Sequence, residues 1–302
     1  HGDTEYIYEG PVYDTIYDTG GIDTIDLSSY TLNITLNLNG GTVSYIGTNE
    51  LWITKPSAVG SSDSYWGSSG FPISISENTI IENAILGDGD DTITCNLAVN
   101  SITCNLGNDT VYNIDTGDTI YGGGGNDIFA LSSINFSSID GGEGLDQISF
   151  EDADANGSSI DLSDYNNSSI TSVEAISTLN SIPALVRLSE QSILNFNGST
   201  SDDIDGDGDS DYYFYIYADS GKDLIVVDSS EWTFYETKNL GYGINLDFFT
   251  SDGGDTYFAS TSGVGVYEAF NSDASNEIDK QTVEENLADA TIGLLSPINI
   301  NQ

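Results

Sequence analysis

The chain has 302 residues, of which 49 are acidic and only five are basic, so its formal net charge is −44 at pH 7. Such a charge repels nucleic acid and anionic membranes, which excludes both as expected partners. The hydrophobic content of 38% and the aromatic content of 11% are too high for a disordered acidic tail. A folded protein of this charge needs counter-ions, and bound calcium is the natural one. No apolar stretch reaches the length of a transmembrane helix.

Four loops rich in glycine and aspartate follow one another in the first half of the chain. The last two match the pattern G-G-x-G-x-D-x-U, in which U is a bulky apolar residue, and the first two keep the central glycine and the aspartate. This pattern is the nonapeptide signature of a calcium-filled parallel β-roll. The loops are Leu86-Gly-Asp-Gly-Asp-Asp91, Cys104-Asn-Leu-Gly-Asn-Asp109, Gly122-Gly-Gly-Gly-Asn-Asp127 and Gly141-Gly-Glu-Gly-Leu-Asp146.

The spacing of the loops predicts how the chain winds. Their last aspartates follow one another at steps of 18, 18 and 19 residues, and apolar residues recur every nine residues from Ile93 to Phe129. Nine residues make one short strand and one turn, so two nonapeptides complete one coil and residues 18 apart stack on the same edge. We therefore predict an all-β fold, a parallel β-roll with a continuous narrow core.

The same loops predict calcium sites. Glycine lets a turn adopt positive φ and lets carbonyl groups crowd around a cation, and aspartate adds a hard anionic oxygen. Calcium takes about six to eight oxygen ligands, more than one loop offers, so each ion should lie between two stacked loops. The candidate metal-binding residues in the loops are Gly87, Gly89, Asp91, Gly107, Asp109, Gly123, Gly125, Asp127, Gly142, Gly144 and Asp146.

The opposite edge of the roll should carry the residues nine positions further on, Asn100, Asp118 and Phe136. Only Asp118 is competent to bind a cation. We therefore expect calcium along one edge and mostly ordinary turns along the other. The single step of 19 implies one extra residue between 133 and 139.

Cys95 and Cys104 are also nine residues apart, which places them on opposite sheets of one coil. A disulfide between them and two inward-facing free thiols both remain open, because the distance between their Cβ atoms cannot be read from a sequence. A four-ligand zinc site is not expected from two thiols.

From about residue 158 the nonapeptide period is lost and short alternating strands take over, at 169–176, 212–217, 223–227, 243–249 and 256–259. We interpret residues 1–157 as the roll and 158–302 as a second, capping or assembly domain, either an antiparallel β-sandwich or an irregular β cap. A short C-terminal helix is expected at 283–295. It could cap the roll, dock onto it or form part of an export signal.

The second half contains one more calcium candidate, a segment that fits the pattern D-x-D-x-D-G-x-x-D. Alternate aspartates in such a loop converge on one cation, although the glutamate that usually completes the set is absent. The candidate ligands are Asp203, Asp205, Asp207, Asp209 and Asp211.

These residues resemble the repeats-in-toxin (RTX) proteins, and in particular the C-terminal β-roll of serralysin-type secreted metalloproteases. The resemblance covers residues 13–165, from Tyr13-Asp-Thr-Ile-Tyr-Asp-Thr-Gly-Gly-Ile-Asp-Thr-Ile-Asp-Leu-Ser28 through the four loops, with an insertion at 45–72 that carries Trp52, Tyr65 and Trp66. It implies an early calcium loop at Asp18, Gly21 and Asp23, and secretion through a type I exporter. The second half is loosely similar to segments of large RTX adhesins.

The resemblance does not carry over the protease activity. A metalloprotease of this kind needs an H-E-x-x-H zinc site, whereas the only histidine of this chain is His1. The chain also lacks methionine and a visible signal peptide, so we interpret it as a processed product or a segment of a larger polypeptide.

We therefore expect a non-catalytic, secreted, calcium-binding protein with a structural or adhesive role at the cell surface, such as a building block of an S-layer, a filament or an adhesin. Self-association, or contact with other surface proteins or glycans, is the expected interaction. Two alternatives remain open: a calcium-dependent module of a larger secreted enzyme, and a carbohydrate-binding module that uses Trp52, Trp66 or the tyrosines of 212–217.

Overall fold

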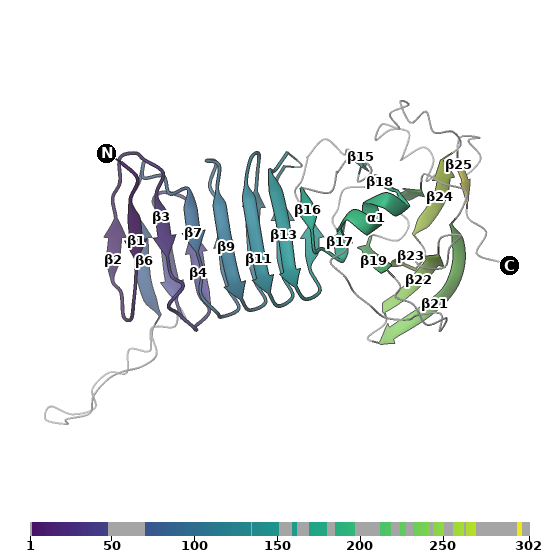
Figure 1. The fold of residues 1–302 in the computed structure, drawn as a ribbon, viewed down its shortest axis with the longest axis horizontal. Coiled ribbons are helices and arrows are strands. Elements are labelled where there is room, and N and C mark those ends of the chain that lie inside the picture. Colours follow the sequence, from purple (N-terminus) through teal and green to yellow (C-terminus); the bar gives the residue numbers. More distant parts are fainter. Residues whose placement is uncertain are drawn as a thin grey trace, which may run out of the picture.

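The protein is an elongated stack of short strands, in which two β-sheets face each other along most of the length (Figure 1). The computed structural model describes residues 2–47, 70–133, 135–150, 159–161, 169–179, 185–196, 212–218, 224–227, 232–241, 244–250, 256–262, 264–269 and 295–297. The all-β prediction is confirmed, because nearly every element in these segments is a strand.

Three sheets contain all of these strands. The first sheet has, in spatial order, β1 (Glu5–Ile7), β3 (Thr24–Asp26), β7 (Asn83–Ile85), β9 (Ser101–Leu106), β11 (Thr119–Gly124), β13 (Ser138–Glu143) and β16 (Ile170–Thr171). The second sheet has β2 (Asp14–Ile16), β6 (Phe71–Ile75), β5 (Val43–Ile46), β4 (Ile34–Asn37), β8 (Thr92–Thr94), β10 (Thr110–Ile114), β12 (Ile128–Leu131), β14 (Gln147–Ser149), β17 (Ala175–Ser177), β19 (Tyr212–Tyr217), β23 (Thr256–Thr261), β22 (Ile244–Thr250) and β21 (Thr233–Gly241). The third has β15 (Ser159–Asp161), β18 (Leu185–Leu188), β20 (Leu224–Val227), β24 (Gly265–Ala269) and β25 (Leu295–Pro297).

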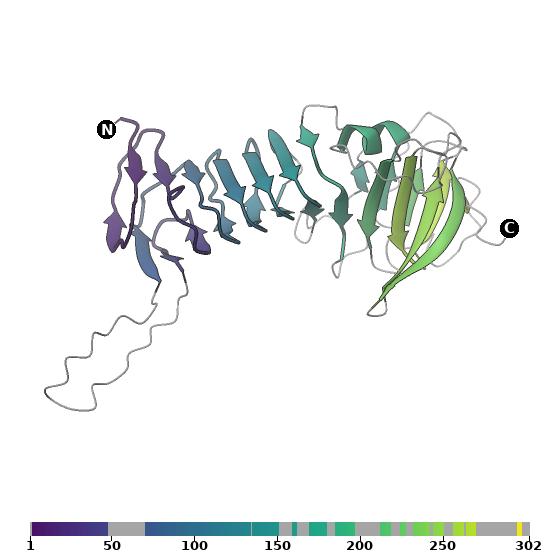
Figure 2. The ribbon, with the colours of Figure 1, turned by 60° about the horizontal axis from the view of Figure 1, so that its bottom comes forward.

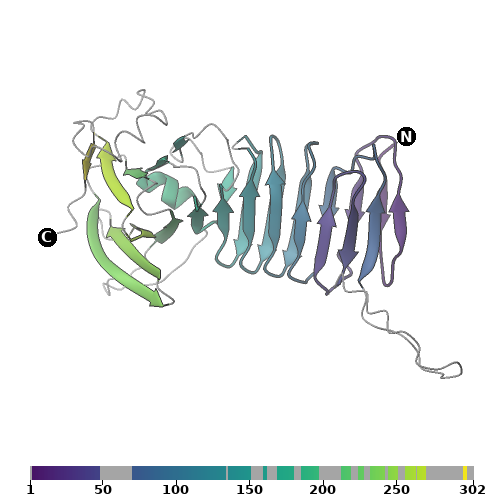
Figure 3. The same ribbon diagram turned by 180° about the vertical axis from the view of Figure 1, so that it is seen from behind.

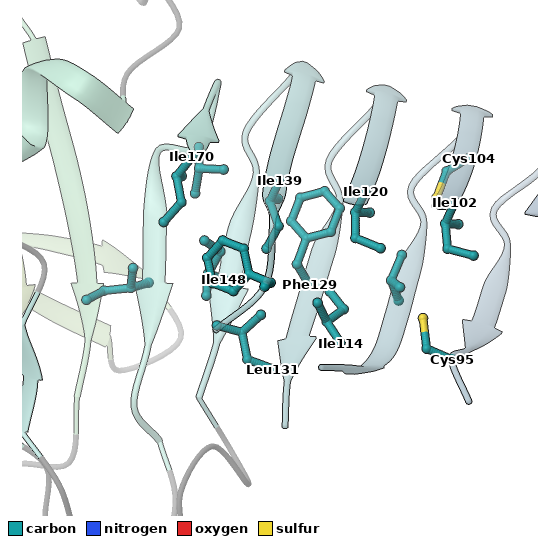
Figure 4. Close-up of a cluster of buried hydrophobic side chains, with 14 of the residues drawn as sticks. Cys95, Ile102, Cys104, Ile114, Ile120, Phe129, Leu131, Ile139, Ile148 and Ile170 are labelled. Carbon is teal, nitrogen blue, oxygen red and sulfur yellow. The ribbon is translucent and has the colours of Figure 1, made fainter. Parts of the chain in front are cut away.

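The predicted coil of two nonapeptides is confirmed by the strand register. Ile102 pairs with Ile120 in the first sheet, and Val111 pairs with Ile93 on one side and with Phe129 on the other in the second sheet, all in parallel. All five side chains are fully buried, and those of Ile102, Ile120 and Phe129 can be seen to point between the sheets in Figure 4. Burying one such side chain stabilises the fold by about 1.5–3 kcal/mol, so the nine-residue apolar period holds the two sheets together.

The extra residue of the 19-residue step lies between Phe129 and Ile139. Paired inward positions follow one another at nine residues before Phe129, but Ile139 comes ten residues after it. The backbone amides of both Ser137 and Ser138 consequently donate to the carbonyl oxygen of Asp118 (2.8 and 3.2 Å). This corrects the sequence prediction that Phe136 continues the opposite edge: Ser137 does so, and Phe136 is buried in the core.

The two described ends of the insertion at 45–72 lie in strands β5 and β6 of the second sheet. β5 pairs antiparallel with both β4 and β6, and β6 pairs in parallel with β2. Trp52, Tyr65 and Trp66 lie outside the described residues.

The described strands of the second half continue the parallel stack, which contradicts the antiparallel sandwich, one of the two predicted arrangements. Ile148 pairs in parallel with Ile176, which pairs in parallel with Ile216, at steps of 28 and 40 residues. The third sheet is parallel from β15 to β24. Among the described strands of this half, antiparallel pairing is confined to β21, β22 and β23 and to β24 with β25. The long curved strands β21 and β22 form the C-terminal end of the stack in Figures 2 and 3.

One hydrophobic cluster runs through the whole stack, from Ile16 to Val264. The expected boundary at residue 157 falls between described segments, and the cluster includes residues on both sides of it. The described residues contain one helix, α1 (Glu190–Phe196), which buries Ile193 and Phe196 in this cluster. Ser189 and Ser192 cap α1 by reciprocal amide-to-hydroxyl hydrogen bonds of 3.0 and 2.8 Å.

The expected C-terminal helix at 283–295 lies almost wholly outside the described residues, and its last residue, Leu295, begins strand β25. The structure has no described helix with the length and apolar character required to span a membrane.

Cys95 and Cys104 are free thiols in the structure, so the disulfide alternative is not formed. They lie on opposite sheets as expected, but both are fully buried and their sulfur atoms occupy separate parts of the core (Figure 4). They act here as small core residues.

Candidate metal sites along the loop edges

Asp91, Asp109, Asp127 and Asp146, which we call the aspartate row, stand one above the other along one edge of the roll, immediately before β8, β10, β12 and β14. In each of the three steps along the row, the Oδ1 atom of one aspartate accepts the backbone amide of the aspartate one coil earlier, at 2.7, 2.8 and 2.7 Å. At the N-terminal end, Asp91 Oδ1 accepts the amide of Ile34 at 2.6 Å. The row is therefore a continuous ladder of carboxylates, and all four side chains are fully buried.

The second carboxylate oxygen of this row lacks a partner. In the described part of the chain, Oδ2 of Asp109, of Asp127 and of Asp146 is buried and accepts no hydrogen bond. Only Asp91 Oδ2 accepts one, from the amide of Gly87 at 3.2 Å. A buried carboxylate oxygen without a partner is costly, and a bound cation would remove that cost.

Glycines bring carbonyl oxygens next to these carboxylates. Gly123, Gly125, Gly142 and Gly144 have φ values of 111°, 129°, 102° and 139°, which side chains rarely tolerate. A Cβ atom at each would collide with a backbone carbonyl oxygen of the preceding coil, those of Asn105, Gly107, Gly123 and Gly125. The loops therefore stack more closely than any other residue type allows, and carbonyl oxygens line the edge.

The two loops that depart from the motif reach similar packing by other means. Asn105 takes the place that pairs with Gly123 and has a φ of 72°, which asparagine tolerates better than most residues. Gly107 has a φ of 124° and packs against the Gly89 carbonyl. Gly87 and Gly89 pack instead against the backbone of Tyr30 and Leu32.

The buried aspartates hold protons tightly when no metal neutralises them. Burial raises the pKa of Asp91 to about 7, of Asp109 to about 8, of Asp127 to about 6 and of Asp146 to about 7. Neighbouring carboxylates add to this, as Asp127 and Asp91 do for the pKa of Asp109. The row is therefore an electrostatically strained set of anions that a divalent cation would relieve.

The opposite row consists of Asp23, Glu82, Asn100 and Asp118, which precede β3, β7, β9 and β11 of the first sheet. Asp118 is buried, but Oδ1 accepts the amide of Asn100 (2.7 Å) and Oδ2 that of Asp115 (2.8 Å). Asn100 and Asp118 thus belong to turns closed by hydrogen bonds, in contrast to the aspartate row.

The early loop lies on this opposite row rather than with Asp91. Asp23 is fully buried, Oδ1 accepts the amide of Thr4 at 2.8 Å, and Oδ2 is without a partner in the described chain. Gly21 has a φ of 142° and packs against the Gly2 carbonyl. Asp18 is half-buried, and it accepts the Tyr6 hydroxyl at 2.8 Å and the amides of Thr19 and Gly20.

Two acidic residues of these rows were missed by the sequence reasoning. Glu174 accepts the amide of Asp146 through Oε2 at 2.8 Å, and Glu82 accepts the amide of Asp23 through Oε2 at 2.8 Å. Each glutamate stands two residues before an inward apolar residue, as each row aspartate does. Searching for E-x-U as well as D-x-U would have found Glu174, which precedes Ile176, but not Glu82, because the inward residue after it is the small Ala84.

No group of three or more His, Cys, Asp or Glu side chains converges on one point in the segments that the structure describes. A calcium ion here would thus draw on carbonyl oxygens together with one or two carboxylates, which suits its preference for oxygen ligands. The candidate ligands Asp203, Asp205, Asp207, Asp209 and Asp211 lie outside the described residues.

The family model described as Peptidase M10 serralysin C terminal matches residues 61–227, more than half of the chain. This chain belongs to the serralysin C-terminal family. The match begins later than the sequence resemblance, which starts at residue 13. It extends through β19 and β20, which lie within residues 158–302, the predicted second domain. No curated protein matches the chain. The serralysin C-terminal family comprises calcium-binding, RTX-type regions of proteins secreted by type I systems, so the chain is such a region and acts outside the cell.

Replacing Gly125 with alanine should destabilise the calcium-loaded protein by at least about 1–2 kcal/mol, because φ at this position is 129° and a Cβ would collide with the Gly107 carbonyl oxygen. The neighbouring change Gly124→Ala is the control, since its Cβ would meet only the end of the Leu106 side chain, at 3.1 Å. Urea unfolding in calcium measures both. Equal midpoints for the two variants would contradict the close stacking of these loops.

Proposed function

We propose that this chain is a non-catalytic structural module of a secreted cell-surface protein, folded and stiffened by calcium. The observation that carries the proposal is the aspartate row, whose buried carboxylates have oxygens without partners beside stacked glycine carbonyls. Without a cation these groups oppose folding, and with one they join adjacent coils. A stack whose coils are joined in this way resists bending, which suits a building block or spacer.

Two further features support a structural role. One hydrophobic cluster extends along the stack. Because the coils share this core, a force or an assembly contact at one end is transmitted along the stack. The chain has a single histidine, at position 1, and so offers no histidine-based zinc or nucleophile site of its own. Self-association or contact with other surface molecules would then be its main interaction.

The second candidate is a calcium-dependent folding and secretion module of a larger enzyme. The family description favours it, because the matching region is the C-terminal part of a peptidase. A carbohydrate-binding role has less support: Tyr215 and Tyr217 stack with ring centroids 6.4 Å apart, but both are half-buried beside Phe248.

Circular dichroism and light scattering, recorded together while calcium is added to chelated protein, test the proposal. We expect a cooperative gain of β signal at about 0.1–1 mM calcium, followed by ordered particles. Magnesium should produce neither, because it demands smaller, octahedral sites. Folding without particles would favour the secretion module, and no response to calcium would refute both.

A further inference from the structure

Two glutamates stand where the rows of loops meet a long insertion. In the aspartate row, 28 residues separate Asp146 from the next position, and Glu174 occupies that position before β17. In the opposite row, 59 residues separate Asp23 from Glu82 before β7. Each glutamate accepts the backbone amide of the preceding aspartate at 2.8 Å, as an aspartate does elsewhere in the row. The longer side chain therefore keeps the ladder intact where no glycine loop precedes it.

The surroundings of Asp146 repeat those of Asp127. Gly122 packs against both the Gly141 carbonyl oxygen and Asp127 Oδ2. Gly141 packs in the same way against the Ser172 carbonyl oxygen and Asp146 Oδ2. Ser172 thus takes the place of a glycine of the next coil, and its φ of 53° is uncommon for a residue with a side chain. The same set of oxygen atoms is assembled outside the repeat.

The carboxylates at this position include an oxygen that a cation could bind. Asp146 is fully buried and its Oδ2 has no partner in the described chain, while Glu174 is buried beside it. The pair Asp23 and Glu82 shares the main features: Asp23 Oδ2 is buried without a partner in the described chain, and Glu82 is half-buried and accepts the Asp23 amide. Here the nearby carbonyl is that of Gly2, which lies in the coil before Asp23 and packs against Gly21. An aspartate with a buried, unpartnered oxygen next to a glutamate therefore occurs on both edges of the roll, so it is not a chance feature of one loop.

We propose that Glu174 with Asp146, and Glu82 with Asp23, form two mixed glutamate–aspartate calcium sites that join the repeat to the coils beyond each insertion. The proposal rests on the calcium-dependent function above, and it adds sites that the nonapeptide motif does not contain. Asp146 Oδ2, the Glu174 carboxylate and the Ser172 carbonyl are hard oxygen donors, the type that calcium prefers.

The Glu174 site would connect calcium to the C-terminal coils. The carbonyl of Glu174 accepts the amide of Tyr215 in β19 at 2.8 Å, and the amide of Val173 donates to Phe196 at the end of α1, also at 2.8 Å. An ion held by Glu174 would therefore fix the start of β17 between the roll, α1 and β19. Calcium would then order the C-terminal coils as well as the repeat itself.

The variant Glu174→Gln tests this, because glutamine keeps the length of the side chain and an oxygen that can accept the Asp146 amide, but removes the charge. Bound calcium is counted by native mass spectrometry of the full chain, and hydrogen exchange is followed at Ala175–Ser177 and at β10. We expect one ion fewer than in the wild type, and loss of calcium-dependent protection at Ala175–Ser177 but not at β10. Glu143→Gln is the matched control, since Glu143 is exposed in the adjacent loop and its loss of charge should leave the ion count unchanged.

Each outcome decides the proposal. An unchanged ion count in Glu174→Gln, with wild-type protection of β17, would show that Glu174 only accepts a hydrogen bond. That result would overturn the proposal. If Glu174→Gln does not fold, Glu82→Gln decides in the same way, with one ion fewer expected and an unchanged count contradicting the proposal. A wild-type chain that binds no calcium would instead refute the proposed function, so the two failures are distinguishable.

Discussion

Asp127→Asn is expected to weaken the calcium-loaded protein and to strengthen the calcium-free protein at pH 8. Asparagine keeps the oxygen that accepts the Asp109 amide (2.8 Å), but it replaces the unpartnered Oδ2 with an amide nitrogen facing a loop lined by carbonyls. In calcium, the loss of one ion removes about 2.7 kcal/mol of stability when calcium is at a hundred times its Kd. Without calcium, the neutral side chain avoids burying an unpaired charge.

Urea unfolding at pH 8, with and without calcium, measures this opposite effect. Asp88→Asn serves as the control, because Asp88 belongs to the first glycine loop but its side chain is exposed. The control should shift both midpoints only slightly. A variant Asp127→Asn that lost stability equally in both conditions would show that the carboxylate has only a structural role, and would contradict a metal site in the aspartate row.

The periodic part of the fold could be predicted because its signal is local. Ile102 and Ile120 pair directly, and nothing but a strand and a turn intervenes between successive inward positions. The nine-residue step therefore gave the two sheets, the inward row and the edge that carries the aspartates. The continuation from Ile148 to Ile176 and Ile216 could not be predicted in this way, because insertions of variable length separate residues that are neighbours in the sheet.

The same limit applies to the candidate sites. Asp109 and Asp127 stand in recognisable loops, whereas Glu174 follows a corner without glycines and joins the row only through its hydrogen bond to Asp146. The row to which Asp23 belongs depends on the long insertion before Glu82, which no local pattern encodes. Motif spacing thus predicts the interior of a solenoid well and its ends poorly, since each end is defined by pairing with a non-repeating segment.

Without calcium, the wild-type protein is expected to be more stable at pH 5 than at pH 8. Burial raises the pKa of Asp109 to about 8, of Asp91 and Asp146 to about 7 and of Asp127 to about 6, whereas aspartate in an unfolded chain titrates near 3.9. Because these pKa values are higher in the folded state, the folded chain binds protons more tightly. Its stability is fully present below about pH 4 and is lost as the pH rises through about 6–8.

Urea midpoints of chelated protein between pH 5 and 8 measure this loss, and Asp109→Asn should reduce the slope, since one pKa unit corresponds to about 1.4 kcal/mol for each titrating group. In saturating calcium, stability should instead rise with pH. Protons and calcium compete for the same carboxylate oxygens, and calcium binds more tightly as the pH rises. Stability that rose with pH in the chelated protein would contradict burial as the cause of the raised pKa values. The charge of the aspartate row can thus be neutralised either by protons or by calcium, but only calcium also joins adjacent coils. At low pH without calcium, the protein should therefore stay folded but be less rigid than the calcium-loaded protein.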